Sequence, residues 1–285
     1  MKRNAIILAA GTASRFVPLS EEVPKGLIEV KGEILLERQI EQLNEAGITD
    51  IVLVVGYMAE KFHYLKGKYG VDIVMNEDYK RYNNISSMIR VVTRLDNTYI
   101  LTSDNYYPKN PFINDDCSSS YYSAIYADGP TDEYCIETDD KDVINRITIG
   151  GCDSWFMYGP VFFSRDFSRI FSGIIKKEYD KEEVRGGYWE DLYIKYMSHL
   201  PMKMRKCSAS DIMEFDSIDE LRVFDPSYIE DTRSKIIRNI AKELECKEGE
   251  LCAFNNLRPE SGISFQFECK GNRYEYTDGL IRSLT

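Results

Sequence analysis

The first third of the chain alternates between short apolar runs and stretches in which apolar side chains recur at helical spacing. Four runs are almost continuously apolar, as in strands buried on both faces of a sheet, and cover residues 4–9, 51–55, 71–75 and 98–102. The helical stretches between them cover residues 33–46, 58–65 and 86–95. This order predicts an α/β fold with a mostly parallel twisted sheet and helices on both of its faces.

The pattern changes after residue 118. Many tyrosine, serine and β-branched residues between 118 and 163 predict antiparallel strands that are added to the sheet. Further helices are expected at residues 165–175, 188–197 and 218–223, and a short strand is expected at 212–215.

The pair Asp225-Pro226 breaks the helical pattern and predicts a domain boundary between residues 1–225 and a small α+β appendage, 226–285. Within the appendage, apolar residues at helical spacing predict one amphipathic helix over 228–244. Two strand-like runs then flank Lys270-Gly271-Asn272, which is a hairpin signal.

The composition fits a globular protein of 285 residues, with 43% hydrophobic and 29% charged residues. The net charge of −11 argues against non-specific binding to nucleic acid or to an anionic membrane, because such binding is driven by positive charge. Seven scattered cysteines without a C-x-x-C pair predict reduced thiols, and only two histidines argue against a zinc site. No run approaches the roughly 20 apolar residues of a membrane span, and no signal-peptide pattern occurs, so we expect a cytoplasmic protein.

The most informative segment is the turn that ends the first predicted strand. It runs Leu8-Ala9-Ala10-Gly11-Thr12-Ala13-Ser14-Arg15 and is followed by Pro18 and by Pro24-Lys25. Its small residues leave room for a nucleotide, and backbone N–H groups together with Arg15 can hold phosphate oxygens. Lys25 supplies a second positive charge. Taken alone, a glycine turn of this kind could also be an ordinary strand-to-helix connection.

This segment resembles the signature loop of the nucleotidyltransferases that join an NTP to a phosphorylated small molecule and release pyrophosphate. The usual pattern is L-A-A-G-x-G-x-R, then P, then P-K, and Ala13 stands here in place of the second glycine. Alanine disfavours a positive φ, so the substitution bears on the loop geometry. The resemblance implies a Rossmann-like nucleotidyltransferase fold over residues 1–225. It also implies that Arg15 holds the β- and γ-phosphates and Lys25 the reacting phosphates.

Two acidic side chains follow predicted strands. Asp104 lies directly after the run at 98–102, at the sheet edge where open α/β folds bind ligands, and a carboxylate there could hold Mg²⁺ against a triphosphate. Asp216 resembles the start of the D-x-x-x-E/D-x-L segment that supplies the second metal ligand in this family. Each has a simpler alternative: Asp104 could cap a turn, and Asp216 or Ser217 could cap the next helix.

The segment Tyr82-Asn83-Asn84-Ile85-Ser86-Ser87 is similar to the N-N-x-x-S stretch of the bacterial phosphocholine cytidylyltransferases. Amide side chains can read a pyrimidine edge or hold a loop against the ligand, and they could equally cap the following helix. The nucleotide contacts that the resemblance implies are Leu8, Ala9, Ala10, Gly11, Thr12, Ala13, Ser14, Tyr57, Asn83, Asn84, Ser87 and Ser103.

Two aromatic segments resemble the parts of this family that surround the choline group. Tyr134 stands where a tryptophan is frequent, and Tyr188-Trp189-Glu190 matches Y-W-D/E. Aromatic faces and a carboxylate suit a trimethylammonium group, each aromatic contact contributing about 0.5–2 kcal/mol. We therefore expect Tyr134, Tyr188, Trp189 and Glu190 around the head group, with the alternative that Tyr188 and Trp189 are core aromatics. Because tyrosine gives a weaker cation–π contact than tryptophan, Tyr134 leaves a less methylated amine as an alternative head group of the acceptor.

The resemblance as a whole implies a CTP:phosphocholine cytidylyltransferase that transfers the nucleotidyl group in line, with Mg²⁺ held by Asp104 and Asp216. One alternative keeps the same reaction with another acceptor, either 2-aminoethylphosphonate or a sugar 1-phosphate. The other alternative is a protein of a different class, a non-catalytic nucleotide-binding module. The appendage 226–285 weakly resembles the opening of choline-kinase-like phosphotransferases. We interpret it as a packing or homodimerisation element, or as the remnant of a longer fusion, without activity of its own.

Overall fold

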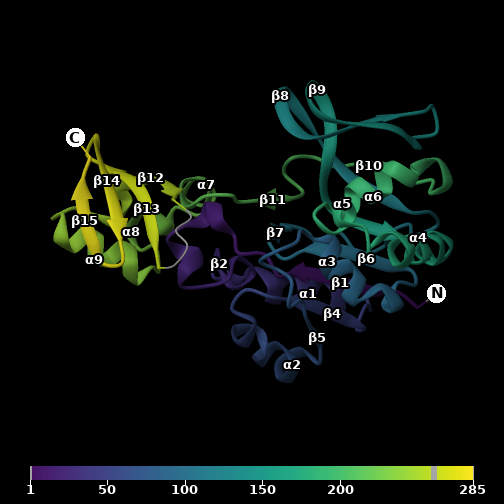
Figure 1. The fold of residues 1–285 in the computed structure, drawn as a ribbon, viewed down its shortest axis with the longest axis horizontal. Coiled ribbons are helices and arrows are strands. Elements are labelled where there is room, and N and C mark those ends of the chain that lie inside the picture. The colour runs from purple at the N-terminus through teal and green to yellow at the C-terminus, as the bar shows by residue number, and fades with distance from the viewer. Residues whose placement is uncertain (1, 258–261, 285) are drawn as a thin grey trace. The chain divides into compact units, whose positions relative to one another are not determined.

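The computed structural model describes residues 2–257 and 262–284 (Figure 1). The chain divides into two compact units. The first consists of Met1–Gly11 and Leu36–Met213, and the second of Thr12–Leu35 and Glu214–Thr285. Each unit is a group of segments that pack mainly against one another, so the units need not coincide with the extent of a protein family. The predicted domain boundary near residue 225 concerns the extent of the family domain and stays a prediction.

The first unit is built on a seven-stranded sheet with the order β10-β8-β9-β6-β1-β4-β5. Its strands are β1 (Asn4–Ala9), β4 (Ile51–Val55), β5 (Asp72–Met75), β6 (Thr98–Thr102), β8 (Tyr121–Thr138), β9 (Ile144–Phe163) and β10 (Lys203–Lys206). Strands β5, β4, β1 and β6 are mutually parallel, whereas β9 runs antiparallel to both β6 and β8. The four predicted parallel strands and the predicted antiparallel additions are therefore confirmed.

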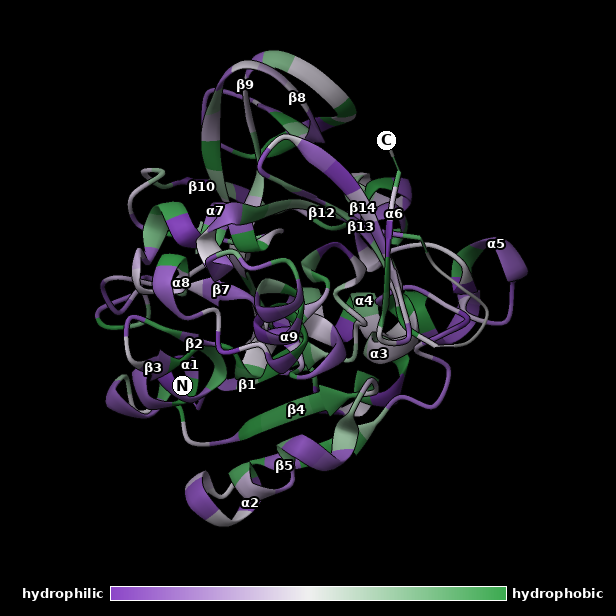
Figure 2. Ribbon diagram, turned by 90° about the vertical axis from the view of Figure 1, so that its left-hand side faces the viewer, coloured by the Kyte–Doolittle hydropathy of each residue, from purple (hydrophilic) through white to green (hydrophobic). Residues whose placement is uncertain are grey.

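Helices cover both faces of this sheet. They are α1 (Leu35–Glu45), α2 (Tyr64–Tyr69), α3 (Ile85–Arg90), α4 (Arg165–Glu178), α5 (Glu182–Arg185) and α6 (Trp189–Tyr196), with 3₁₀ turns at Ala59–Phe62, Val92–Arg94 and Met197–His199. Ile6 and Val52 share one core cluster with residues of α3, α4 and α6. Ile7 follows Ile6 in β1 and therefore points to the opposite face of the sheet, and it is equally buried. The apolar residues of α1 are buried as well. Figure 2 shows β4 hydrophobic along its length and α2 largely hydrophilic, as expected for a central strand and a surface helix.

The helix expected at 58–65 is replaced by two short pieces. Met58 has a left-handed backbone (φ 49°), a 3₁₀ turn follows it, and α2 begins only at Tyr64. Gly70, with φ 73°, then ends α2. The apolar spacing located the segment correctly, but local backbone turns decided where the helix begins and ends.

The second unit combines the segment after the signature loop with the C-terminal part of the chain. The loop segment holds 3₁₀ turns at Ser14–Phe16, Leu19–Glu21 and Lys25–Leu27 and the short pair β2 (Glu29–Val30) and β3 (Glu33–Ile34). Two further two-residue strands are β7 (Asn105–Tyr106), in the first unit, and β11 (Met213–Glu214), where the chain passes from the first unit to the second. The helices are α7 (Ile218–Phe224), α8 (Ser227–Glu230) and α9 (Lys235–Glu243).

A four-stranded antiparallel sheet closes the second unit. Its strands follow in chain order: β12 (Leu251–Asn256), β13 (Ser264–Cys269), β14 (Asn272–Thr277) and β15 (Leu280–Ser283). The predicted hairpin is confirmed as β13 and β14, and both of its turn residues, Lys270 and Gly271, have positive φ as a tight hairpin requires.

The prediction of one continuous helix over 228–244 is wrong. The chain leaves the helical conformation between α8 and α9, where Arg233 adopts φ 61°. Ser234 then caps α9 by accepting a hydrogen bond from the Ile237 N–H (3.1 Å). Tyr228 and Ile240 are both buried. Apolar residues recur at helical spacing in the sequence on both sides of the break, and this misled the sequence-based prediction.

Close packing behind the signature loop makes Gly56 sensitive to substitution. A Cβ atom there would lie 2.7 Å from Cβ and Cγ of Tyr79 and 2.9 Å from the carbonyl oxygen of Ala10. We expect Gly56→Ala to lower the free energy of unfolding by about 1–3 kcal/mol in a urea titration. Gly67→Ala in α2 is the matched control, because its Cβ would meet no atom within 4 Å. Equal stability of the two variants would contradict this account.

Candidate active site

The carboxyl ends of three parallel strands bring several of the predicted nucleotide contacts to one edge of the first unit. Leu8 pairs in register with Thr102 of β6, and Ala9 with Val55 of β4. Just beyond the strands, the Ser103 N–H donates to the Leu8 carbonyl (3.1 Å) and the Tyr57 N–H donates to the Ala10 carbonyl (3.1 Å). Residues 8–10, 57, 103 and 104 therefore lie at the edge where open α/β sheets bind ligands.

The signature loop uses Ala13, rather than Gly11, for its unusual backbone conformation. Ala13 has φ 50° and ψ 46°, in the left-handed region, whereas Gly11 has no positive φ. A left-handed residue other than glycine costs about 1–2 kcal/mol. Position 13 thus has the left-handed conformation that a glycine would favour, although it is an alanine. Contacts elsewhere in the fold must offset the cost of this conformation.

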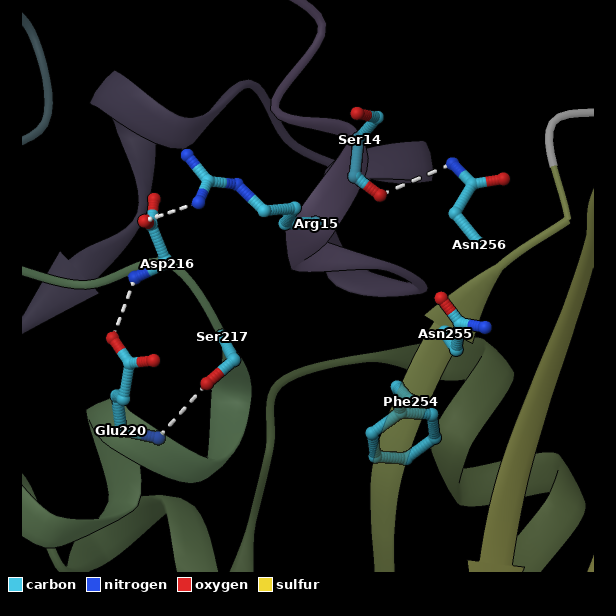
Figure 3. Close-up of a pocket in the computed structure, with 8 residues that line it drawn as sticks. All are labelled: Ser14, Arg15, Asp216, Ser217, Glu220, Phe254, Asn255 and Asn256. Carbon is cyan, nitrogen blue, oxygen red and sulfur yellow. Dashed lines mark hydrogen bonds and ion pairs between the residues drawn. The ribbon is translucent and has the colours of Figure 1, made fainter. Parts of the chain in front are cut away.

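Both predicted phosphate-binding cations contact the same carboxylate in the second unit. Arg15 Nη1 lies 2.9 Å from one Asp216 oxygen, and Lys25 Nζ lies 3.2 Å from the other (Figure 3 shows the Arg15 contact). Lys25 Nζ is also 4.0 Å from Glu214 Oε1. The Arg15 side chain is 75% exposed and that of Lys25 only 12%, so the arginine can reach an incoming ligand while the lysine is held in place.

The structure shows which residue caps the helix after Asp216, while the role of Asp216 as a metal ligand stays a prediction. Ser217 caps α7, since its Oγ accepts the Glu220 N–H (3.2 Å). Glu220 in turn accepts the Asp216 N–H (2.9 Å; Figure 3). The side chain of Asp216 is therefore not used as a helix cap and stays directed at the two cations.

The residues present fit a metal ion that arrives with its substrate. Among residues 2–257 and 262–284, no group of three or more His, Cys, Asp or Glu side chains is arranged to hold a metal ion by itself. Mg²⁺ is commonly bound by one or two carboxylates and completed by phosphate oxygens and water. Asp104, half-buried after β6 in the first unit, and Asp216 in the second unit are each a carboxylate of that kind. Because Asp216 already contacts Arg15 and Lys25, a metal could take its oxygens only as those cations move to another anion.

Asn83 and Asn84 connect two segments of the first unit instead of capping α3. Asn83 Nδ2 donates to the Gly186 carbonyl (2.6 Å), and Asn84 Nδ2 donates to Glu190 Oε2 (3.1 Å). The Asn84 side-chain oxygen also accepts the Trp189 N–H (2.8 Å). No side-chain cap forms at the start of α3. The two amides therefore fix the position of α6, and their contact with a nucleotide stays a prediction.

Ser87 is buried rather than open to a ligand. Its hydroxyl and that of Ser86 accept hydrogen bonds from Asn76 Nδ2 at 3.0 and 2.9 Å. Asn76 thereby joins the end of β5 to α3. In this structure the Ser87 hydroxyl helps to hold α3 in place, and its contact with a nucleotide stays a prediction.

Asp191, which is not among the predicted site residues, organises the aromatic segment. Its Oδ1 accepts a hydrogen bond from the Tyr134 hydroxyl (2.8 Å), and its Oδ2 accepts one from the Tyr188 N–H (2.8 Å). It lies three residues after Tyr188, which is the spacing of a capping interaction at the start of α6. That spacing was the available signal for Asp191, and the Tyr134 contact requires the fold.

Tyr188 and Trp189 have different surroundings. The Tyr188 side chain is 46% exposed, whereas Trp189 is 2% exposed and packs in the core. Its ring lies nearly parallel to that of Tyr122 (centroids 5.8 Å apart) and edge-on to that of Phe163 (5.3 Å). Of the two, only Tyr188 offers an aromatic face to a ligand.

Glu190 is a half-buried acid beside these rings. Burial raises the pKa of its carboxyl to about 7, against the opposing effect of hydrogen bonds from Asn84 (3.1 Å) and the Tyr122 hydroxyl (3.3 Å). Near neutral pH the group is thus close to the point where it gains or loses its charge. A cation placed beside it would favour the ionised form.

Comparison with known proteins finds relatives of one chemical class. Residues 5–126 match the family described as the MobA-like NTP transferase domain. The chain is 36% identical to the choline-phosphate cytidylyltransferase of Streptococcus pneumoniae over 219 residues, which are 77% of this chain and 95% of that protein. It is 34% identical to the 2-aminoethylphosphonate cytidylyltransferase of Lancefieldella rimae over 231 residues, 80% of this chain and 94% of that one.

A solved structure agrees with these relatives. The CTP:phosphocholine cytidylyltransferase from Streptococcus pneumoniae superposes with a TM-score of 0.75 at 34% identity. The match covers 99% of that chain and 80% of this one, so about a fifth of this chain has no counterpart there. In the part of the chain that the structure describes, no helix is both long and apolar enough to span a membrane.

The raised pKa of Glu190 predicts a pH-dependent stability. Between the ordinary glutamate value and about 7, the folded protein keeps a proton that the unfolded chain has released, so this site loses stability as pH rises. Glutamine does not titrate. We therefore compare the melting temperature of Glu190→Gln with that of the wild type at two pH values. The difference in favour of the variant should be larger at pH 8 than at pH 5. Glu183→Gln, on an exposed residue, is the control; a Glu190→Gln difference that is the same at both pH values would refute the assignment.

Proposed function

The chain belongs to the nucleotidyltransferase family that includes the bacterial choline-phosphate cytidylyltransferases, and on that basis we propose that it joins CTP to phosphocholine, giving CDP-choline and pyrophosphate. The observation that carries the proposal is that Arg15 of the signature loop and Lys25 after it both form ion pairs with Asp216. Two cations and a candidate metal ligand lie together there, and this supports the proposal that a triphosphate binds at this place.

In this reaction a phosphate oxygen of phosphocholine attacks the α-phosphorus of CTP. The new P–O bond forms as the bond to the β-phosphate oxygen breaks, and pyrophosphate leaves on the opposite side. The protein aligns the two substrates and neutralises their charge, and no covalent intermediate is required. We assign Arg15 to the β- and γ-phosphates, Lys25 to the reacting phosphates, and the backbone of residues 8–14 to the nucleotide.

Asp104 and Asp216 are the residues that would hold Mg²⁺, which when bound supplies further positive charge to the phosphates. The contacts of Asp216 suggest an exchange of partners. Arg15 and Lys25 would turn from its carboxylate to the triphosphate, and the freed carboxylate oxygens would face the metal. Charge would then stay balanced before and after binding, which avoids the cost of leaving an ion unpaired.

For the acceptor we propose a site formed by Tyr134, Tyr188 and Glu190, with Asp191 holding the two tyrosine segments together. A quaternary ammonium group donates no strong hydrogen bond, so aromatic faces and a nearby carboxylate suit it. Trp189 is left in the core, where it supports α6. We also infer a cytoplasmic location, which the seven free cysteines support.

2-Aminoethylphosphonate is the second candidate acceptor, because a 2-aminoethylphosphonate cytidylyltransferase is 34% identical over 80% of this chain. Its primary ammonium group would need hydrogen-bond acceptors, which Glu190 and Asp191 could provide.

Pyrophosphate release with CTP and a series of acceptors tests the proposal. We expect phosphocholine to give a kcat/KM at least about tenfold higher than 2-aminoethylphosphonate, a difference of about 1.4 kcal/mol in transition-state binding. The reverse order would establish the second candidate. A preference for a sugar 1-phosphate would refute the assignment of Tyr134, Tyr188 and Glu190 to the head group.

Lys25→Ala should remove most of the turnover and leave the fold intact. The variant loses a charge-assisted contact to the reacting phosphates, and we expect kcat to fall about 10²-fold or more, as when a preorganised electrostatic group is removed. Lys66→Ala, on the exposed surface of α2, is the matched control and should behave as the wild type. Circular dichroism checks the fold of both. A near-normal kcat in folded Lys25→Ala would take Lys25 out of the mechanism.

A further inference from the structure

Three segments that are far apart in the sequence line one cavity of the second unit (Figure 3). Ser14 and Arg15 come from the signature loop, and Asn255 and Asn256 come from β12. Asp216 directly precedes the N-cap of α7, and Glu220 lies in its first turn. The cavity has a volume of about 310 Å³. Two of these segments already belong to the proposed triphosphate site. The third belongs to the C-terminal sheet, for which the sequence predicted no activity.

β12 makes a direct hydrogen bond to the signature loop. Asn256 Nδ2 donates to the carbonyl oxygen of Ser14 (3.1 Å), and Figure 3 shows the two groups facing each other. That carbonyl belongs to the peptide bond between Ser14 and Arg15. The bond therefore restrains the backbone that directly follows Ala13, with its left-handed conformation, and directly precedes the phosphate-binding arginine.

β12 is itself firmly attached to the segment that carries Asp216. Arg222 of α7 is buried and donates to the Leu251 carbonyl (2.6 Å) and to the Glu248 carbonyl (2.9 Å). The Ala253 N–H donates to Asp219 Oδ2 (2.8 Å). These contacts fix β12 against α7. A loop that is bonded to β12 is thereby placed relative to Asp216 as well.

We propose that Asn256 is a positioning residue for nucleotide binding. Its hydrogen bond to Ser14 holds the signature loop so that Ala13 stays in the left-handed conformation, which an alanine would otherwise abandon. The C-terminal sheet is then part of the machinery that binds the triphosphate of CTP, and this inference rests on the proposed function for the identity of that ligand. Without the bond, the loop relaxes away from the left-handed conformation and Arg15 spends less time in place.

Asn256→Ala tests the proposal through two measurements, the Kd of CTP with Mg²⁺ by calorimetry and the KM of each substrate. We expect the Kd and KM for CTP to rise about 3–10-fold, which is the effect of losing one hydrogen bond, and the KM for phosphocholine to change less than about twofold. Asn272→Ala, at the exposed start of β14, is the matched control and should leave all values unchanged. If Asn256→Ala does not fold, Asn256→Ser, too short to reach Ser14, takes its place.

Glycine at position 13 supplies the decisive comparison. Ala13→Gly adopts the left-handed conformation without strain, so the loop no longer needs Asn256. In that background we expect Asn256→Ala to change the Kd for CTP less than about twofold, and this loss of effect measures the coupling between the two positions. A purely structural role would lower the melting temperature and leave the Kd for CTP unchanged. That result, or an equal effect in both backgrounds, would overturn the proposal.

The test separates this inference from the proposed reaction. A wild-type protein that binds CTP but transfers the nucleotide to none of the acceptors would refute the reaction, while the Kd comparison would still decide the role of Asn256. A wild-type protein that binds no CTP would overturn both.

Discussion

The carboxylate of Asp216, shared between Arg15 and Lys25, is the interaction on which the proposed chemistry depends. Two cations held close together without a ligand would repel each other, and this acid lets them stay close in a protein whose overall charge is −11. The same acid is the candidate metal ligand. In the proposed triphosphate site, charge is thus gathered before the ligand arrives, and such preorganisation favours nucleotidyl transfer.

In the first unit, several predicted ligand contacts also bond to one another or to nearby backbone, and these bonds hold their segments in place. Asn84 bonds both Glu190 and the backbone of Trp189, and Asp191 bonds both Tyr134 and Tyr188. Trp189 anchors α6 in the core, which leaves Tyr188 at the surface. The proposed acceptor residues Tyr134, Tyr188 and Glu190 are therefore held by a network of supporting contacts, and such contacts keep a binding geometry fixed.

The parallel sheet could be predicted because its strands, such as Ile51–Val55, are continuously apolar, and burial on both faces demands that pattern. The break between α8 and α9 could not, because the apolar spacing continues through it and only a local cap and a left-handed Arg233 interrupt the helix. The glycine turn with its two cations located the nucleotide loop. Asp191 bonds to Tyr134, which is 57 positions away in the sequence, and Asn256 bonds to Ser14, which is 242 positions away. A single sequence contains no signal for contacts of that range.

The left-handed Ala13 also bears on how this chain can change over evolutionary time. If β12 supports the loop, glycine at position 13 makes residue 256 free to drift, whereas alanine at position 13 constrains it. The exchange of glycine for alanine would be neutral only in a lineage that already possessed the C-terminal sheet. Positions 13 and 256 would then form an epistatic pair, in which the history of one determines the mutational tolerance of the other.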